Sequence, residues 1–269
     1  MELLIYGHNW KGIDYVLLKR YDQALYHFEK GLSMEPEIPV GPYDAICMNL
    51  GWIYDHIRDD LYQSERYYQL VRNRFLQGIG GRGVLRGIKI NEALGILYVR
   101  FELREKALRH GLEAKRLLKD YKKSAHDYQQ RDYLVHHILG EAYKGLGRLD
   151  TAMVCLNYCL TMQHEQTNKN ALNISRIYGT IGDVYRQKED FESALQNDRL
   201  AVEWALKIPD IHQLFKQKEI AGCYNNLAAT IALMGNQEEA LRIQQKCLAT
   251  SFAGYRPADF LELPNPDSL

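Results

Sequence analysis

Apolar residues recur along the chain at spacings of three and four residues, and short breaks rich in glycine and charged residues separate the blocks that share this spacing. Such a period is typical of amphipathic α-helices, because residues three and four apart lie on one helical face. The breaks at residues 19–22, 145–148, 187–190 and 234–237 combine helix stop signals with the start of a new helix. The pattern therefore predicts an all-α protein made of successive helices.

A short motif recurs in register with these helices: Leu or Ile, then Gly, then Tyr three residues after the glycine. A small residue, usually alanine, follows about nine residues after the tyrosine. Full copies of the motif are Leu50-Gly51…Tyr54, Leu94-Gly95…Tyr98, Leu139-Gly140…Tyr143 and Ile181-Gly182…Tyr185, and weaker ones surround Gly12 and Ala228. The small residues are Ala24, Ser64, Ala107, Ala152, Ala194 and Ala240. Self-similarity at a period of a few tens of residues indicates a protein of stacked repeats.

Each repeat is expected to be a pair of antiparallel helices. The first helix carries the glycine and the tyrosine on its inner side, and the second helix carries the alanine. Four residues after the alanine comes a packing position, held by Phe28, Tyr68, Gly111, Leu156, Asp198 and Gln244. Small side chains where glycine and alanine face each other would let the two axes approach to roughly 8 to 10 Å.

These residues resemble the tetratricopeptide repeat, whose pattern of glycine, tyrosine, alanine, an aromatic residue and proline is best matched by Gly12, Tyr15, Ala24, Phe28 and Pro36. Six copies begin near residues 5, 44, 88, 133, 175 and 221, further apart than the roughly 34 residues of the standard repeat. The extra length predicts helical extensions over 124–136, 168–178 and 209–224. Long repeats of this kind resemble those of kinesin light chains, spindle-orientation adaptors and bacterial peptide-sensing regulators.

The resemblance implies a right-handed superhelical solenoid of about six helix pairs over residues 1–251, followed by a non-helical tail over 252–269 that contains three prolines. The sequence leaves three alternatives open for the arrangement of this end of the chain. The tail lies back on the last repeat through Phe252, Tyr255, Phe260 and Leu263, the uncapped edge pairs with another chain, or the chain is part of a longer polypeptide.

Charge and composition narrow the range of partners. The 34 basic and 34 acidic residues give a formal net charge of zero, so there is no overall basic excess for nucleic acid or for an anionic membrane surface, although a basic patch formed only in the fold stays open. Stretches of about 18 consecutive apolar residues are absent, so no membrane insertion is expected. The beginning of the chain lacks the features of an export signal, which favours a cytoplasmic protein.

Catalytic and metal-binding motifs are absent from the sequence. The five cysteines are odd in number, contain no Cys-x-x-Cys and are expected to be reduced core residues. The glycine-rich stretch 77–87 lacks the Gly-Lys-Ser/Thr of a phosphate-binding loop and is interpreted as a connector. His136 and His137 are adjacent, so on a helix they point about 100° apart and cannot both face one metal. We therefore expect no enzyme, no cofactor and no metal.

The family resemblance also implies where a partner binds, because the first helices of such repeats line a concave groove. Transferred to this chain, the groove positions give a candidate site for a peptide or a partner helix. These residues are Asn49, Trp52, Asp55, Lys89, Glu92, Arg100, His137, Glu141, Lys144, Asp183, Arg186, Asn225 and Asn226. The same positions also select Asn9, Ile13, Met48, Ile96, Thr180 and Ala229. Amides bond an extended backbone without reading its sequence, whereas the charges and Trp52 would select side chains.

Three functions are compatible with this pattern. The favoured one is a non-enzymatic adaptor or scaffold that holds a peptide or a partner helix in the groove. The alternative is the peptide-sensing domain of a bacterial signalling or transcription regulator whose output domain is separate or missing. The third is self-association through the uncapped ends of the stack.

Overall fold

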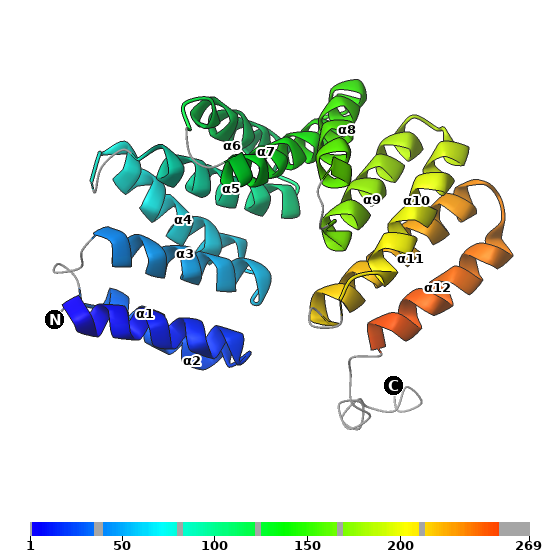
Figure 1. Ribbon diagram of the computed structural model, residues 1–269. Helices are drawn as coiled ribbons and strands as arrows, with labels where there is room; N and C mark the ends of the chain where they lie inside the picture. The colour runs from blue at the N-terminus through cyan, green and yellow to red at the C-terminus, as the bar shows by residue number, and fades with distance from the viewer. Residues whose placement is uncertain are drawn as a thin grey trace, which may run out of the picture. The chain divides into compact units, whose positions relative to one another are not determined.

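All regular structure in the described part of the chain is helical (Figure 1). The computed structural model describes residues 2–34, 40–79, 83–121, 125–165, 169–209 and 213–252. Within these ranges there are twelve helices and no strand. The helices are α1 (Glu2–Leu17), α2 (Tyr21–Leu32), α3 (Val40–His56), α4 (Leu61–Leu76), α5 (Val84–Arg100), α6 (Arg104–Leu118), α7 (Ala125–Gly145), α8 (Leu149–Glu165), α9 (Ala171–Gln187), α10 (Phe191–Leu206), α11 (Gln213–Leu233) and α12 (Gln237–Phe252). The expected all-α repeat fold is confirmed.

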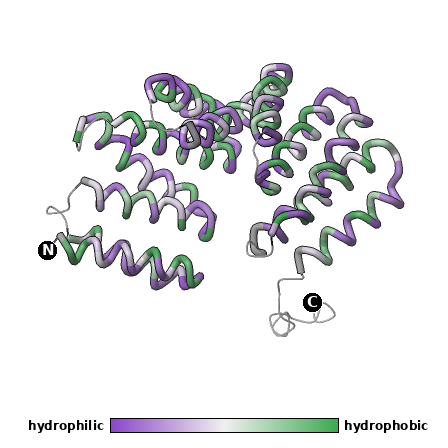
Figure 2. Tube along the Cα trace, in the orientation of Figure 1, coloured by the Kyte–Doolittle hydropathy of each residue, from purple (hydrophilic) through white to green (hydrophobic). Residues whose placement is uncertain are grey.

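The chain divides into two compact units, Met1–Leu146 and Gly147–Leu269. In the first unit the pairs α1/α2, α3/α4 and α5/α6 pack in chain order, and α7 packs on α5 and α6. In the second unit α8 packs on α9, which pairs with α10, and α11 pairs with α12. Figure 2 shows apolar and polar stretches alternating along the helices, as expected when each helix buries one face.

The turn from the first to the second helix of a repeat is built in the same way along the chain. In five repeats the residue seven places after the motif glycine or its substitute has a positive φ, and in the second repeat it is the eighth. These residues are Lys19, Asp59, Glu102, Gly147, Glu189 and Gly235. The left-handed residue ends the first helix. In three repeats the second helix then begins with a side-chain cap, in which Asp60, Asp190 and Asn236 accept a hydrogen bond from the backbone amides of Gln63, Ser193 and Glu239, respectively.

The motif glycine makes room for a large side chain from the second helix. A Cβ added to Gly51 would lie 2.4 Å from Cε1 of Tyr68, and one added to Gly12 would lie 2.4 Å from Cε1 of Phe28. Those two aromatic residues are the packing positions four residues after the small residue. The predicted meeting of the glycine and the small residue is also seen, because Oγ of Ser64 donates to the backbone oxygen of Gly51 at 2.9 Å. The sequence did not predict that the large side chain one turn later covers the glycine.

The third repeat shows how successive pairs interlock. Both the motif position and the packing position are glycines here, Gly95 and Gly111, and Ile138 of the following helix α7 fills the space. A Cβ on Gly95 would lie 2.9 Å from Cγ2 of Ile138, and one on Gly111 would lie 3.2 Å from the same atom. The following helix therefore packs into the groove between the two helices of the preceding pair.

Other sequence-based predictions can be compared with the helix bounds. The long first helices are confirmed in α7 and α11, each of 21 residues, whereas α9 begins only at Ala171 and, with 17 residues, is no longer than α3 or α5. Cys47, Cys155, Cys159 and Cys223 are buried, as core cysteines should be. The glycine-rich connector is shorter than predicted, because α5 already begins at Val84. The tail after Phe252 lies outside the described residues, and the right-handed superhelix stays a prediction.

Candidate functional site

The predicted groove residues lie on the first helices of the repeats, as expected, but many of them also join neighbouring repeats. Asn49 of α3 donates from Nδ2 to Oδ1 of Asn9 on α1, at 3.1 Å. On α7, Lys144 pairs with Glu141 at 2.9 Å, and the ring of His137 stacks on Tyr133 with centroids 6.0 Å apart. A hydrogen-bonded or ion-paired side chain is less available to a partner than an unpaired one. The predicted site residues therefore fall into two groups, those paired within the protein and those left to contact a partner.

Asp55 and Arg100 form a tie between the second and third repeats. Asp55 lies at the end of α3 with 1% of its side chain exposed, and Nη1 of Arg100 at the end of α5 lies 2.5 Å from its Oδ1. Arg100 also pairs with Asp59 in the preceding turn. Burial raises the pKa of Asp55, and the charges of His56 and Arg100 act in the opposite direction. Trp52, one turn earlier, remains partly exposed and stacks on His56 with centroids 5.0 Å apart.

Glu92 is a second buried acid at a contact between repeats. Its side chain is 3% exposed, and Nη1 of Arg131 on α7 lies 2.6 Å from Oε2. Burial raises the pKa of Glu92, while Arg131 acts against that rise. Asp55 and Glu92 therefore hold neighbouring repeats together in this structure and present little surface to a partner.

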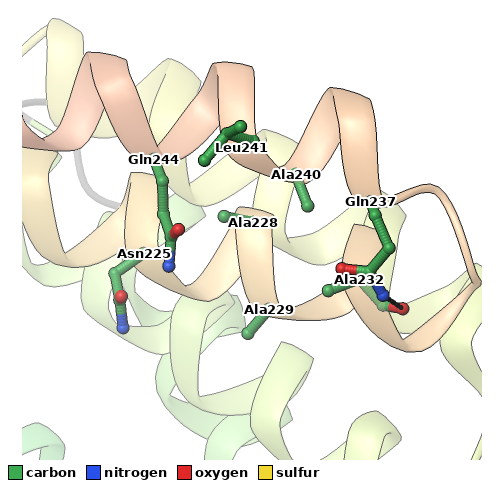
Figure 3. Close-up of a pocket in the computed structure, with 8 residues that line it drawn as sticks. All are labelled: Asn225, Ala228, Ala229, Ala232, Gln237, Ala240, Leu241 and Gln244. Carbon is green, nitrogen blue, oxygen red and sulfur yellow. Dashed lines mark hydrogen bonds between the residues drawn. The ribbon is translucent and has the colours of Figure 1, made fainter.

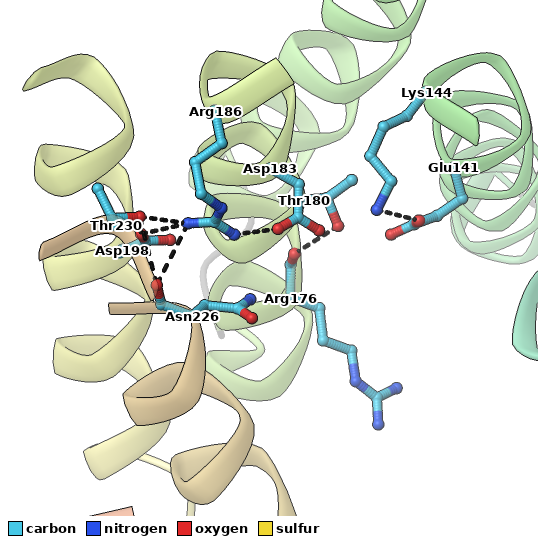
Figure 4. A network of polar contacts seen from close by, with 9 residues as sticks. All are labelled: Glu141, Lys144, Arg176, Thr180, Asp183, Arg186, Asp198, Asn226 and Thr230. Carbon is cyan, nitrogen blue, oxygen red and sulfur yellow. Dashed lines mark hydrogen bonds and ion pairs between the residues drawn. The ribbon is translucent and has the colours of Figure 1, made fainter. Parts of the chain in front are cut away.

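Arg186 is the centre of a polar network in the second unit (Figure 4). Its Nη1 lies 2.5 Å from Oδ2 of Asp198 on α10 and donates to Oγ1 of Thr230 on α11 at 2.6 Å. Its Nη2 pairs with Asp183, one turn earlier on α9. The hydroxyl of Thr230 donates to Oδ2 of Asp198 at 2.5 Å. The network thus connects three helices from two repeats.

Asp198 occupies the packing position that holds Phe28 and Tyr68 in the first two repeats. Its side chain is fully buried, and a Cβ on Gly182 would lie 2.4 Å from its Oδ1. Burial raises the pKa of Asp198 to about 6, against the hydrogen bond from Thr230 and the charge of Arg186.

Four residues of the predicted site make no side-chain hydrogen bond or ion pair with the described residues: Trp52, whose ring stacks on His56, Lys89, Asn225 and Asn226. Lys89 and Asn225 are exposed, and Asn226 is partly buried. The amide of Asn226 lies beside α9, because its Nδ2 is 3.8 Å from where Gly179 would carry a Cβ. A Cβ on Gly222, one turn before Asn226, would meet nothing within 4 Å. Two glycines therefore leave open space around the Asn226 amide.

Sequence reasoning missed most of the pairings. Asp198 was identified as a packing residue, and an acid in place of an aromatic residue was the available signal. A second signal is the position nine residues before the motif glycine or its substitute. In three repeats the residue at this position contacts the preceding repeat. The pairs are Arg86 with Asp44, Arg131 with Glu92, and Glu219 with Ser175.

Two searches of the described residues found nothing. No three or more histidine, cysteine or acidic side chains there are grouped so as to hold a metal ion. None of the helices described has the length and apolar character needed to cross a membrane.

The fold and the repeated glycine packing define a helical repeat protein, and the comparisons identify its class. Family models described as tetratricopeptide repeat match residues 134–164, 175–207 and 220–251. The chain is a repeat protein of the tetratricopeptide type. Proteins of this type form modules for interaction with other proteins.

Among solved structures, the chain is similar to BtubC (BKLC) from P. vanneervenii, with a TM-score of 0.60 and 14% identity over 97% of this chain and 94% of that one. The Rap protein complexed with Competence and Sporulation Factor has a TM-score of 0.72 and 11% identity over 93% of this chain and 65% of that one. PilF from Pseudomonas aeruginosa has a TM-score of 0.54 and 14% identity over 93% of each chain. At these identities the likeness shows the fold alone. A search of curated proteins gave no match.

Proposed function

We propose that this protein is a non-enzymatic scaffold that binds a partner protein through an extended peptide segment, and that the face formed by α9 and α11 is one place where the segment lies. The observation that carries the proposal is the unpaired amide of Asn226 beside Gly179 and Gly222. An amide offers both a donor and an acceptor, which matches the two groups of a peptide bond. Glycines on either side let a backbone approach closely.

The neighbouring groups support an extended segment over a single small ligand. Asn225 is exposed next to Asn226. Arg176, one turn before Thr180 on α9, is 47% exposed although its Nε pairs with Glu219 of α11 at 3.2 Å. The guanidinium of Arg186 beneath is bonded to Asp198, Asp183 and Thr230, so it fixes the two helices without supplying the contact itself. A rigid platform with a few unpaired polar groups at its surface favours binding to main-chain groups.

In the first unit, Lys89 and Trp52 are the groove residues best placed to select side chains. Lys89 is exposed and unpaired, and Trp52 keeps part of its ring accessible over His56. Such a pair suits a partner that carries an acidic residue near an apolar one. The alternative function, a peptide sensor that acts on an output domain, stays a prediction.

The test is a comparison of captured partners from the native lysate, identified by mass spectrometry and then measured as purified proteins. Asn226→Ala should weaken binding of the partner about fivefold, since one hydrogen-bonding amide contributes on the order of 1 kcal/mol. Gly222→Ala should weaken it as well, because a methyl group would occupy the open space. Lys89→Glu should weaken the binding of a partner that carries an acidic residue.

Matched controls are available on the same chain. Asn157→Ala alters an exposed asparagine on α8, and Lys169→Glu alters an exposed lysine just before α9. Both controls should bind as the unmodified chain does. If the Asn226 and Gly222 variants have normal helical content by circular dichroism and bind the partner as tightly as the unmodified chain does, the α9/α11 face is not the binding site.

A further inference from the structure

The first helix carries a stripe of exposed apolar side chains. Leu3, Trp10 and Leu17 are spaced by seven residues, so they lie along one face of α1. They are 88%, 62% and 77% exposed, respectively. Large apolar side chains gathered in one stripe usually mark a surface that is covered in the functional state.

Equivalent positions in later repeats face the preceding repeat. Trp10 lies two residues before the motif glycine, the place held by Asn49, which bonds Asn9, and by Ile138, which packs over Gly95 and Gly111. Leu17 lies five residues after the motif glycine, as does Arg100, which pairs with Asp55 of the preceding repeat.

Leu3 lies nine residues before the motif glycine, as do Arg86 and Arg131, which pair with Asp44 and Glu92 of the preceding repeats. All three residues of the stripe therefore occupy positions that elsewhere contact a preceding helix pair. In the first repeat these positions are apolar.

The complementary surface is the groove of the last helix pair, α11 and α12 (Figure 3). The groove has a volume of about 350 Å³ and is lined by Ala228, Ala229, Ala232, Leu241 and other residues that Figure 3 labels. It faces away from α9 and α10, because Asn226 and Thr230 on the other side of α11 bond Arg186.

The groove also matches the one that α7 fills in the first unit. Ala228 and Gln244 stand at the positions of Gly95 and Gly111, which receive Ile138. Alanine in place of larger residues keeps the α11 side of the groove open. Leu241 on its edge is 59% exposed, so the groove offers apolar surface as well as space.

We propose that two copies of this chain associate end to end, with α1 of one copy seated in the groove between α11 and α12 of the other. Trp10 takes the place that Ile138 occupies within the stack. The occupant is a second copy because the apolar stripe and the open groove are the two halves of one type of contact, the packing of a first helix on a preceding pair. Such a contact joins different surfaces on the two copies, so it forms chains or closed rings.

Two substitutions test this contact from opposite sides. Trp10→Glu disrupts the stripe, and Leu241→Arg disrupts the groove. Both residues are well exposed, so neither change should unfold the chain, which circular dichroism would verify. Tyr62→Glu, on an aromatic residue of α4 that is 74% exposed, is the matched control.

Sedimentation of the unmodified chain from about 1 μM to about 100 μM should show the mass rising above 31.3 kDa as the concentration increases. Trp10→Glu or Leu241→Arg alone should weaken association at least about 30-fold, as expected for an anchor residue of an interface. Tyr62→Glu should associate as the unmodified chain does. A mixture of the Trp10 and Leu241 variants should form a dimer that grows no further, because each variant keeps one intact surface.

Several results would overturn the proposal. A strict monomer over the whole concentration range is one, and a mixture of the two variants that forms no dimer is another. Association that appears only after removal of residues 253–269 would assign the groove to the tail of the same chain. Because none of these measurements involves a peptide ligand, they are independent of the proposed function.

Discussion

At the scale of single residues, the buried acids decide how neighbouring repeats are joined. Asp55, Glu92 and Asp198 are each less than about a tenth exposed, and each faces an arginine. Burial disfavours their charged forms, whereas the arginines favour them. The net direction is a raised pKa at all three carboxyl groups.

The first prediction concerns the pH dependence of stability at Asp198. Its pKa is about 6 in the folded chain against 3.8 for an unperturbed aspartate, so the folded chain holds this proton more tightly than the unfolded chain does. The stability that this proton contributes is fully present below about pH 4 and is lost as the pH rises through about 6. Relative to Asp198→Asn, the free energy of unfolding should fall by on the order of 1 to 3 kcal/mol across that window.

Urea denaturation of both proteins at several pH values measures this difference. Asp14→Asn, at an exposed aspartate of α1, is the control for removing a carboxyl group without burial. A difference between the unmodified chain and Asp198→Asn that stays flat from pH 4 to pH 6 would show that Asp198 is ionised throughout.

The pairings of these acids show the limit of sequence reasoning at this scale. The register of the repeats placed Asp55, Glu92 and Arg186 on first helices of the repeats, where the structure has them. The sequence analysis predicted that these residues contact a ligand, because the side chains with which they pair lie far away in the sequence. Arg131 is 39 residues from Glu92, and Thr230 is 44 residues from Arg186. Repeat periodicity determines which positions are neighbours, but the choice between a ligand contact and an inter-repeat contact depends on side-chain reach.

At the scale of helices, the close packing of the two helices of a repeat depends on the motif glycine. Tyr68 lies directly over Gly51, and it is 3% exposed. The sequence predicted close approach at this glycine but not the residue that covers it, since helix rotation decides which turn of the second helix lies opposite.

The second prediction is that Gly51→Ala destabilises the protein by about 1 to 3 kcal/mol, because the added methyl group would overlap the ring of Tyr68. Gly222→Ala is the matched control, also inside a helix but with nothing within 4 Å of the added carbon. That control should be neutral or stabilise by up to about 1 kcal/mol. Thermal or urea unfolding of both variants measures the effect, and equal stabilities would contradict the packing described.

The third prediction concerns the tie between α3 and α5. Arg100→Ala should cost about 3 kcal/mol, because it leaves the buried Asp55 without its main partner. Arg58→Ala removes another arginine that pairs with an aspartate of the preceding helix pair, but Arg58 and Asp22 are 44% and 88% exposed. The expected loss there is less than about 1 kcal/mol.

A double-mutant cycle separates the pair from its surroundings. Asp55→Asn in the Arg100→Ala background should recover part of the lost stability, since an amide has no buried charge to leave unpaired. Additive effects of the two substitutions would mean that Asp55 and Arg100 act independently.

At the scale of the whole molecule, the repeat architecture was the most predictable feature. Six copies of one motif in register determine an all-helical stack, because each pair can bury its apolar face only against its neighbours. The division into Met1–Leu146 and Gly147–Leu269 was not predicted, and it falls inside the fourth repeat, between α7 and α8. The motif is present on both sides of that boundary, so periodicity alone gives no signal for it.

The last prediction follows from the fact that each repeat makes its packing contacts with the neighbouring repeats. A loss of stability in one unit should spread little to the other, because stacked repeats gain their stability from local packing and nearest-neighbour contacts. Gly51→Ala should therefore speed hydrogen exchange most in α1 to α4, whereas Gly182→Ala, whose added carbon would lie 2.4 Å from Oδ1 of Asp198, should speed it most in α9 to α12. Hydrogen exchange measured by mass spectrometry resolves these segments. If either substitution speeds exchange equally in both units, the chain opens as one cooperative body, and the coupling between the units is stronger than the packing within them.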